Sequence, residues 1–176
     1  MLETERLILR LWEASDAGDL FRFASDERVG PAAGWRPHTS VEDSRQIIRE
    51  VLSFPETYAI VFKETGTVIG SIGLMQGKQS HLELSEDEAE LGFWVAVPYW
   101  GQGIMTEAAT ELIRHGFEDL GLSRIYCGYF EGNERSAAVQ RKLGFQYRKT
   151  VPYYAAQLDE ERTLIVQVLV NPKYEI

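Results

Sequence analysis

The sequence predicts a single α+β domain built on a mixed sheet, because short apolar runs typical of strands are interrupted by helical patterns. Its 176 residues are enough for one domain with a substantial core. No repeat, linker or low-complexity tract divides the chain. We therefore expect residues 1–176 to fold as one unit.

A strand, a glycine turn and a helix in direct succession form the centre of this prediction. The run Leu91–Val97 indicates a buried strand, which Pro98 ends because proline cannot donate to a sheet ladder. Gly101–Gly103 predicts a tight turn, and from Ile104 onward apolar residues recur three and four apart on one helical face. Unpaired N–H groups and the helix dipole make such a helix start attractive to anions. We expect the N–H groups of residues 101–106 to bind a pyrophosphate.

Before this unit, the pattern predicts three strands and two helices. The strands are expected at residues 6–12, 58–62 and 68–75. Ser15 or Asp16 caps the first helix, and Thr39 or Ser40 caps the second. Glycines and prolines make residues 26–39 irregular in this prediction.

After the central helix, the pattern predicts three more strands and one short helix. The strands are expected at residues 123–130, 146–153 and 163–170. Asn133 or Glu134 begins the helix, and Gly144 ends it.

Charge and composition narrow the possible functions. Asp plus Glu is 27 and Lys plus Arg is 18, so the formal net charge is −9. This balance argues against nucleic acid as the main partner and mildly favours a cationic substrate. No apolar run approaches the roughly 18 residues of a membrane span, and the charged N-terminus does not resemble a signal peptide. Cys127 is the single cysteine, which fits a reducing compartment. We expect a cytoplasmic monomer or homodimer that binds neither nucleic acid nor membrane.

Other glycine-rich phosphate sites fit the turn less well. A nucleoside-triphosphate loop needs Lys and Ser or Thr after its last glycine, whereas Gly103 is followed by Ile104. A dinucleotide site needs a third glycine. A nucleotide-dependent enzyme is therefore the weakest of our alternatives.

Two segments in this order carry a stronger signal than the glycine turn alone. Tyr99–Ala108 contains the turn, and Asn133–Phe145 follows it. With Glu90–Trp94 and the opening Glu5–Arg10, they resemble the GNAT superfamily of acyl-CoA-dependent N-acetyltransferases, especially its ribosomal-protein N-terminal branch, over nearly the whole chain. The resemblance implies a mixed, mostly antiparallel sheet of seven strands, splayed between the fourth and fifth. It also implies acetyl transfer from acetyl-CoA, with the pantetheine arm in the gap between those strands.

The same resemblance implies the cofactor contacts. Main chain near Val95 and Val97 would pair with the pantetheine amides, and Asn133 would hydrogen-bond the same arm. The pyrophosphate would be held by Gln102, Gly103, Ile104, Met105 and Thr106. The family's usual loop begins with Gln or Arg three positions before the first glycine. Here that position is Pro98, which removes one side-chain contact.

Acyl transfer to an amine needs a base, stabilisation of the carbonyl oxygen and an acid for the thiolate. Many family members place a tyrosine acid seven residues after the helix asparagine. Here that residue is Gln140, which cannot act as an acid, so Ser136 is the nearest candidate. Glu90 is the candidate base, through water or directly, and the Val95 N–H is the candidate oxyanion donor.

The acceptor stays open among a protein N-terminus, a polyamine, an amino acid and an aminoglycoside. The missing tyrosine supports a second hypothesis, a catalytically silent acyl-CoA-binding or sensing module. Cys127 lies in a predicted strand, so we expect it to be a small core residue and not a nucleophile, and we expect direct attack by the amine.

The other candidate residues have both functional and ordinary interpretations. His38 either lines the acceptor pocket or lies in a surface loop, and His81 is expected in a polar loop at residues 76–89. Four acidic residues of that loop are expected to be solvated, with a possible role in gathering a cation: Glu83, Glu86, Asp87 and Glu88. Arg141 and Lys142 either reach the phosphates or favour the helix dipole. No histidine has a metal-ligand companion at useful spacing, so we expect no metal.

Overall fold

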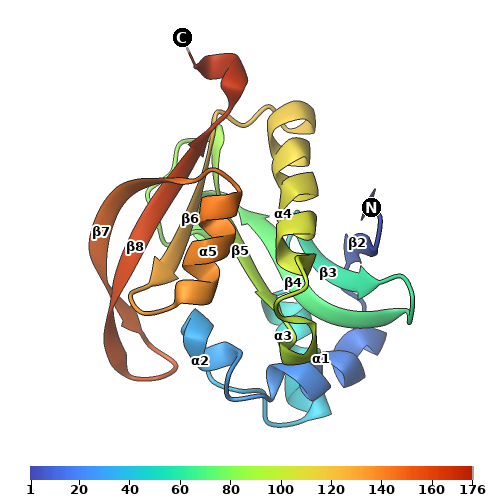
Figure 1. Cartoon of the computed structure of the whole chain (residues 1–176). Helices are drawn as coiled ribbons and strands as arrows, with labels where there is room; N and C mark the ends of the chain where they lie inside the picture. The colour runs from blue at the N-terminus through green and yellow to red at the C-terminus, as the bar shows by residue number, and fades with distance from the viewer. Residues whose placement is uncertain (176) are drawn as a thin grey trace.

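The computed structural model describes residues 1–175, which form one open mixed sheet with helices packed on it (Figure 1). The strands are β1 (Leu2–Glu3), β2 (Leu7–Leu11), β3 (Thr57–Phe62), β4 (Thr67–Met75), β5 (Glu88–Val95), β6 (Arg124–Phe130), β7 (Gln146–Ala155) and β8 (Glu160–Val170). Their order is β1-β2-β3-β4-β5-β6-β8-β7, and all neighbours are antiparallel except β5 and β6. The α+β mixed sheet is confirmed, with one strand more than the seven expected. The additional strand, β1, has two residues, too few to show any alternation.

Within residues 1–175, five α-helices accompany the sheet. They are α1 (Ala17–Ala24), α2 (Gly30–Ala33), α3 (Val41–Glu50), α4 (Ile104–Arg114) and α5 (Glu134–Lys142). A π-helical turn, His115–Asp119, extends α4, and short 3₁₀ turns lie at Ala14–Asp16, Gly77–Gln79, Val97–Tyr99 and Pro172–Tyr174. None of the helices among residues 1–175 combines the length and apolar character that a bilayer crossing requires.

The caps explain where two of these helices begin. Ser40 Oγ accepts a hydrogen bond from the Asp43 N–H at 2.9 Å, and Asn133 Oδ1 accepts one from the Ser136 N–H at 3.2 Å. Both caps are among the predicted ones. The expectation of wholly irregular chain at residues 26–39 is wrong, because α2 forms one turn there before Gly34 ends it at φ 91°.

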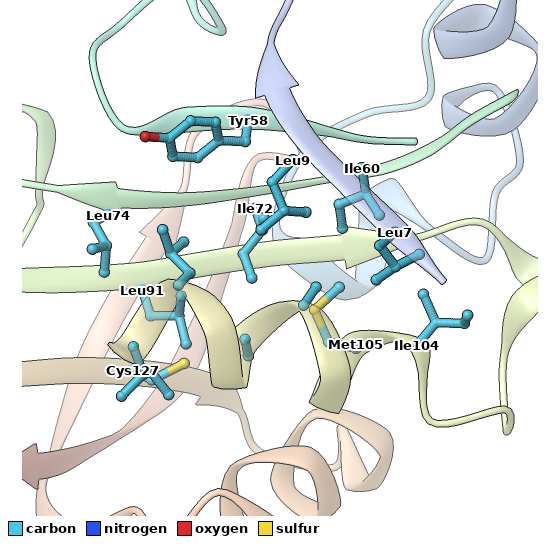
Figure 2. Close-up of a cluster of buried hydrophobic side chains, with 14 of the residues drawn as sticks. Leu7, Leu9, Tyr58, Ile60, Ile72, Leu74, Leu91, Ile104, Met105 and Cys127 are labelled. Atoms are coloured by element: carbon cyan, nitrogen blue, oxygen red, sulfur yellow. The ribbon is translucent and has the colours of Figure 1, made fainter. Parts of the chain in front are cut away.

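Alternating residues of the N-terminal strands pack on opposite faces of the sheet. Leu7 and Leu9 join the larger core under α4, while Ile8 joins a smaller core under α1 and α3. Figure 2 shows part of the larger core, in which Ile104 and Met105 of α4 meet side chains of β2, β3 and β5. This packing fixes the start of α4 against the centre of the sheet.

The sheet separates in its middle. β5 and β6 pair from Glu88–Arg124 to Leu91–Cys127 and no further. Their remaining residues, 92–95 and 128–130, each pair with the strand on the other side. The predicted splay between the fourth and fifth strands, which are β5 and β6 here, is therefore present.

Candidate active site

The first turn of α4 presents main-chain N–H groups that the chain itself does not use. Gly101 and Gly103 adopt φ values of 73° and 74°, which other residues adopt only with strain. No side chain caps α4, and the first bond at its start runs from the Glu107 N–H to the Gly103 carbonyl oxygen at 3.0 Å. Within residues 1–175, the N–H groups of residues 104–106 therefore have no partner. They are free to bind an anion.

Arg6 ties this turn to the N-terminal edge of the sheet. Its Nε donates to Glu107 Oε1 at 2.8 Å, and its Nη1 donates to the Gln102 carbonyl oxygen at 3.0 Å. Glu107 also accepts bonds from Thr4 Oγ1 at 2.6 Å and from the Arg6 N–H at 3.0 Å. Burial alone would raise the pKa of Glu107, but these hydrogen bonds outweigh burial and lower the pKa. The sequence interpretation gave Arg6 no such role.

Trp100 and Arg135 form a second bridge beside the turn. The Trp100 indole N–H donates to the Val95 carbonyl oxygen at 2.8 Å, and the Arg135 guanidinium carbon lies 3.4 Å from the centroid of the Trp100 ring system. Arg135 has no carboxylate partner in the part of the chain that the structure describes. A cation in the first turn of a helix opposes the dipole. The unfavourable position of Arg135 therefore indicated that this residue has a function, which we did not predict from the sequence.

The edge of β5 that faces the gap carries main-chain groups that do not pair with β6. The Ala96 N–H donates to the Ile69 carbonyl oxygen of β4 at 2.8 Å. Because main-chain groups alternate in direction along a strand, those of Phe93 and Val95 are directed away from β4. They therefore face the gap, and Phe93 joins the predicted Val95 on this edge.

β5 ends at Val95, so the predicted strand end at Val97 is wrong. Val97 begins a 3₁₀ turn with Pro98, and its carbonyl oxygen accepts the Trp100 N–H at 3.1 Å. No strand continues past Pro98, as expected, but β5 ends at Val95, two residues before the predicted end at Val97. Val97 lies off the cavity wall.

A cavity of about 710 Å³ occupies the gap and the space beneath it. Five of the predicted site residues line it: Glu90, Val95, Met105, Asn133 and Ser136. Its aromatic lining consists of Trp35, Phe54, Phe93, Trp94, Trp100, Tyr129, Phe130 and Tyr153. A concave pocket that combines aromatic and aliphatic side chains with placed polar groups is typical of a small-molecule site.

The remaining predicted phosphate contacts lie outside this cavity. Gly103 and Thr106 line a shallower hollow of about 510 Å³ on the other side of the turn, beside Lys142. Ile104 is 1% exposed and packs in the core, so only its main chain is available to a ligand. The exposed Gln102 side chain donates back to a loop carbonyl oxygen at 2.9 Å.

Ser136 is held so that its hydroxyl proton is free. Gln140, which is 0% exposed, donates from Nε2 to Ser136 Oγ at 3.2 Å and to the Gly128 carbonyl oxygen at 3.0 Å. Gln167 donates in turn to Gln140 Oε1 at 2.9 Å. An amide nitrogen can only donate, so Ser136 Oγ is the acceptor and its own proton can be given elsewhere.

Glu90 and His81 form a hydrogen-bonded pair on the cavity wall. Glu90 is 6% exposed, and its Oε1 lies 3.0 Å from His81 Nε2. Its Oε2 accepts a bond from Ser80 Oγ at 2.6 Å. The hydrogen bond to Glu90 raises the pKa of His81. His81 lies in a loop, as expected, but the sequence carried no signal for its contact with β5.

Three further predicted residues can now be placed. Glu88 belongs to β5, is 8% exposed and pairs with Arg124 at 3.5 Å, so its assignment to a solvated loop is wrong. The other three acidic residues of that loop are exposed.

Cys127 is 1% exposed, and burial raises its pKa, which makes it a poor nucleophile. His38 lines the cavity, with Nδ1 2.8 Å from Ser44 Oγ. No group of three or more potential metal ligands lies close together in residues 1–175.

The splayed mixed sheet and the glycine turn before α4 define an acyltransferase of the GNAT fold. A profile of the acetyltransferase (GNAT) domain matches residues 6–146, which include this turn, Glu90 and Ser136. The chain belongs to the GNAT family of acetyltransferases. The predicted resemblance is therefore confirmed, and the chain is an N-acetyltransferase by family.

Individual relatives agree with this assignment over most of their length. The uncharacterized N-acetyltransferase p20 of Bacillus licheniformis is 33% identical over 150 residues, which cover 82% of each chain. The uncharacterized N-acetyltransferase YoaA of Bacillus subtilis is 29% identical over 178 residues, covering 98% of each. The crystal structure of ribosomal-protein-S5-alanine acetyltransferase from Vibrio fischeri matches with a TM-score of 0.77 and 23% identity, over 99% of this chain and 98% of that one.

Proposed function

We propose that the protein transfers the acetyl group of acetyl-CoA to a primary amine by direct attack within a ternary complex. One observation carries this proposal: the cavity in the gap between β5 and β6 is lined by Met105 in the uncapped first turn of α4, by Val95 on the strand edge, and by both Glu90 and Ser136. The start of an anion-binding helix, a strand edge and two polar side chains thus lie along a single path.

The groups on this path fit the parts of acetyl-CoA. The free N–H groups of residues 104–106 would hold the pyrophosphate, with Gly103 allowing its close approach. Arg135, unpaired and stacked on Trp100, would add positive charge beside this turn in a chain of net charge −9. The gap-facing main chain of β5 at Val95 and Phe93 would bond to the pantetheine amides. The contacts of Gln102, Val97 and Asn133 stay predictions, and Asn133 already caps α5.

The side chains in the cavity fit the chemistry. Ser136 would donate its free proton to the departing thiolate, and the Val95 N–H would stabilise the carbonyl oxygen. Glu90 supplies negative charge close to where an amine would lie. A covalent route through Cys127 is disfavoured because the thiol is buried and its pKa is raised.

The acceptor would be a small-molecule amine or a protein N-terminal amine. The name of the Vibrio fischeri protein specifies a ribosomal-protein alanine, which favours including N-terminal peptides among the candidates. We propose a cytoplasmic monomer or homodimer without nucleic-acid or membrane partners, in keeping with the acidic composition.

The test is coenzyme A release from saturating acetyl-CoA with a panel of peptides, polyamines, amino acids and aminoglycosides. We expect turnover on at least one of these amines, with kinetics of a ternary complex. Tight binding of coenzyme A without turnover on any amine would support the alternative, a silent acyl-CoA-binding module suggested by Gln140. Ping-pong kinetics would contradict direct attack.

A further inference from the structure

Both carboxylate oxygens of Glu90 are occupied before any substrate arrives. Ser80 Oγ donates to Oε2 at 2.6 Å, and His81 Nε2 lies 3.0 Å from Oε1. The Glu90 side chain is 8% exposed, whereas the His81 side chain is 47% exposed, and both residues line the cavity. An approaching amine therefore meets the imidazole far more easily than the carboxylate.

We propose that His81 is the catalytic base that removes the proton from the acceptor amine, and that Glu90 is the positioning residue that holds it. This inference rests on the proposed acetyl transfer and replaces Glu90 as the base. A carboxylate that accepts a bond from Nε2–H fixes the neutral tautomer in which Nδ1 carries the lone pair. Nδ1 is then the nitrogen that can take a proton. This is the arrangement of a base oriented by a third group.

The surroundings of His81 keep the ring in one orientation. The Tyr153 ring of β7 lies edge-on, with 5.2 Å between centroids and 65° between planes. Tyr153 itself packs on Phe130, at 5.2 Å between centroids. The ring is thus held by a carboxylate from β5 and an aromatic wall from β7, although its own loop is polar.

The protons balance over the reaction. The acceptor begins as an ammonium ion, and His81 Nδ1 takes one proton to leave a neutral amine with a free electron pair. That pair forms the new carbon–nitrogen bond as the carbon–sulfur bond of the thioester breaks. Ser136 gives its hydroxyl proton to the thiolate, and the second proton, which the nitrogen then loses, restores the Ser136 hydroxyl. His81 returns its proton to solvent through its exposed edge, so the products are the amide, the thiol and one released proton.

His81 faces one ionisable group directly, its partner Glu90. Two further ionisable groups, Tyr153 and Cys127, lie beside the pair of His81 and Glu90. The hydrogen bond that Glu90 accepts from His81, together with the charge of Glu90, raises the pKa of His81 against the lowering effect of burial. Burial and the Glu90 charge raise the pKa of both Tyr153 and Cys127, so these groups stay neutral while His81 titrates. Activity should therefore rise with pH as His81 loses its proton, and removal of the Glu90 charge should move this rise to lower pH.

The experiment measures the pH profile of kcat/KM for the full-length protein and three variants, with one amine acceptor throughout. We expect His81→Gln to lower kcat/KM by about 10²–10⁴-fold, the usual contribution of a general base, and to remove the acidic limb assigned to His81. Glu90→Gln keeps the shape of the side chain but not its charge, so it should retain part of the activity and shift that limb to lower pH. Glu64→Gln, an equal loss of charge at an exposed residue in the turn between β3 and β4, is the matched control and should leave the profile unchanged.

Coenzyme A binding by calorimetry separates this assignment from the proposed function. All variants should bind coenzyme A like the parent, since the pair lies away from the phosphate turn. If the His81→Gln variant turned over almost as fast as the parent while the Glu90→Gln variant was inactive, the assignment would be overturned. Glu90, and not His81, would then be the base. A parent protein that binds coenzyme A but acetylates no amine would overturn the proposed function, and this inference with it.

Discussion

The Gln140 side-chain amide lies 3.2 Å from Ser136 Oγ. Gln140 occupies the position at which the resemblance to the family would place a tyrosine acid. Gln140 does not face the cavity. It joins α5 to Gly128 of β6 and Gln167 of β8 instead, and so fixes the serine that does face the cavity.

Replacement of Ser136 tests this relationship. We expect Ser136→Ala to lower kcat by about 10²-fold, the lower end of acid catalysis, with little change in coenzyme A affinity, because the hydroxyl acts after binding. Gln140→Leu should also lower kcat and should destabilise the fold by about 1–3 kcal/mol, since it leaves buried polar partners unpaired. The double variant should be no slower than the slower single variant. Fully additive losses in kcat would show that the two side chains act independently.

Replacement of Gly103 tests the phosphate turn. Gly103→Asp places a carboxylate where the main chain approaches the phosphates, so we expect loss of measurable coenzyme A binding by calorimetry. The new residue must also adopt φ 74°, which costs about 1–2 kcal/mol.

Gly66→Asp is the matched control for this strain. Gly66 has φ 70° and open space around it, in the turn between β3 and β4. This variant should show a similar loss of stability in urea unfolding and unchanged coenzyme A affinity. Retained affinity in Gly103→Asp would place the phosphate site elsewhere.

Replacement of Glu107 tests the tie between Arg6 and the turn. Glu107→Gln weakens the hold on Arg6 and therefore on the Gln102 carbonyl, and we expect the Kd for coenzyme A to rise about tenfold, or ~1.4 kcal/mol.

The same variant has a defined pH dependence. The pKa of Glu107 is lower in the folded chain than its ordinary 4.5, so the carboxylate stabilises the fold fully above that ordinary value. This stabilisation is lost as the pH falls through the folded pKa. The difference in unfolding free energy between the parent and Glu107→Gln should therefore shrink in acid. Glu64→Gln, an exposed turn carboxylate, should show no such trend.

Replacement of Cys127 tests direct attack. Cys127→Ala removes a buried thiol that the proposed reaction does not use, so turnover should stay within a few-fold of the parent and stability should fall by about 1 kcal/mol. Intact mass spectrometry of the parent during turnover should show no added acetyl group. A stable acetyl adduct on Cys127 would contradict the mechanism.

The main elements could be predicted because they carry periodic signals. The glycines at 101 and 103 and the helical face from Ile104 predicted the start of α4 to the residue, and Ser40 and Asn133 predicted two caps. The end of β5 was misplaced because Val95 and Val97 are both β-branched, and propensity does not show where a ladder breaks.

The site was harder to predict because its contacts join segments without a shared pattern. His81 lies in a polar loop and meets Glu90 only when that loop folds back over β5. Arg135 stands beside Trp100 because α5 ends up next to the turn before α4. Such pairs follow from the tertiary packing, and no spacing along the chain encodes them.

Only four residue pairs join β5 to β6, and they connect two larger parts of the sheet, strands β1–β5 and strands β6–β8. An elongated ligand whose amides bond to the open edge of β5 would connect the two parts of the sheet. Binding of the acyl donor should then slow amide hydrogen exchange in both parts together, including positions far from the ligand. Whether the two parts unfold separately or together would thus depend on whether the donor is bound.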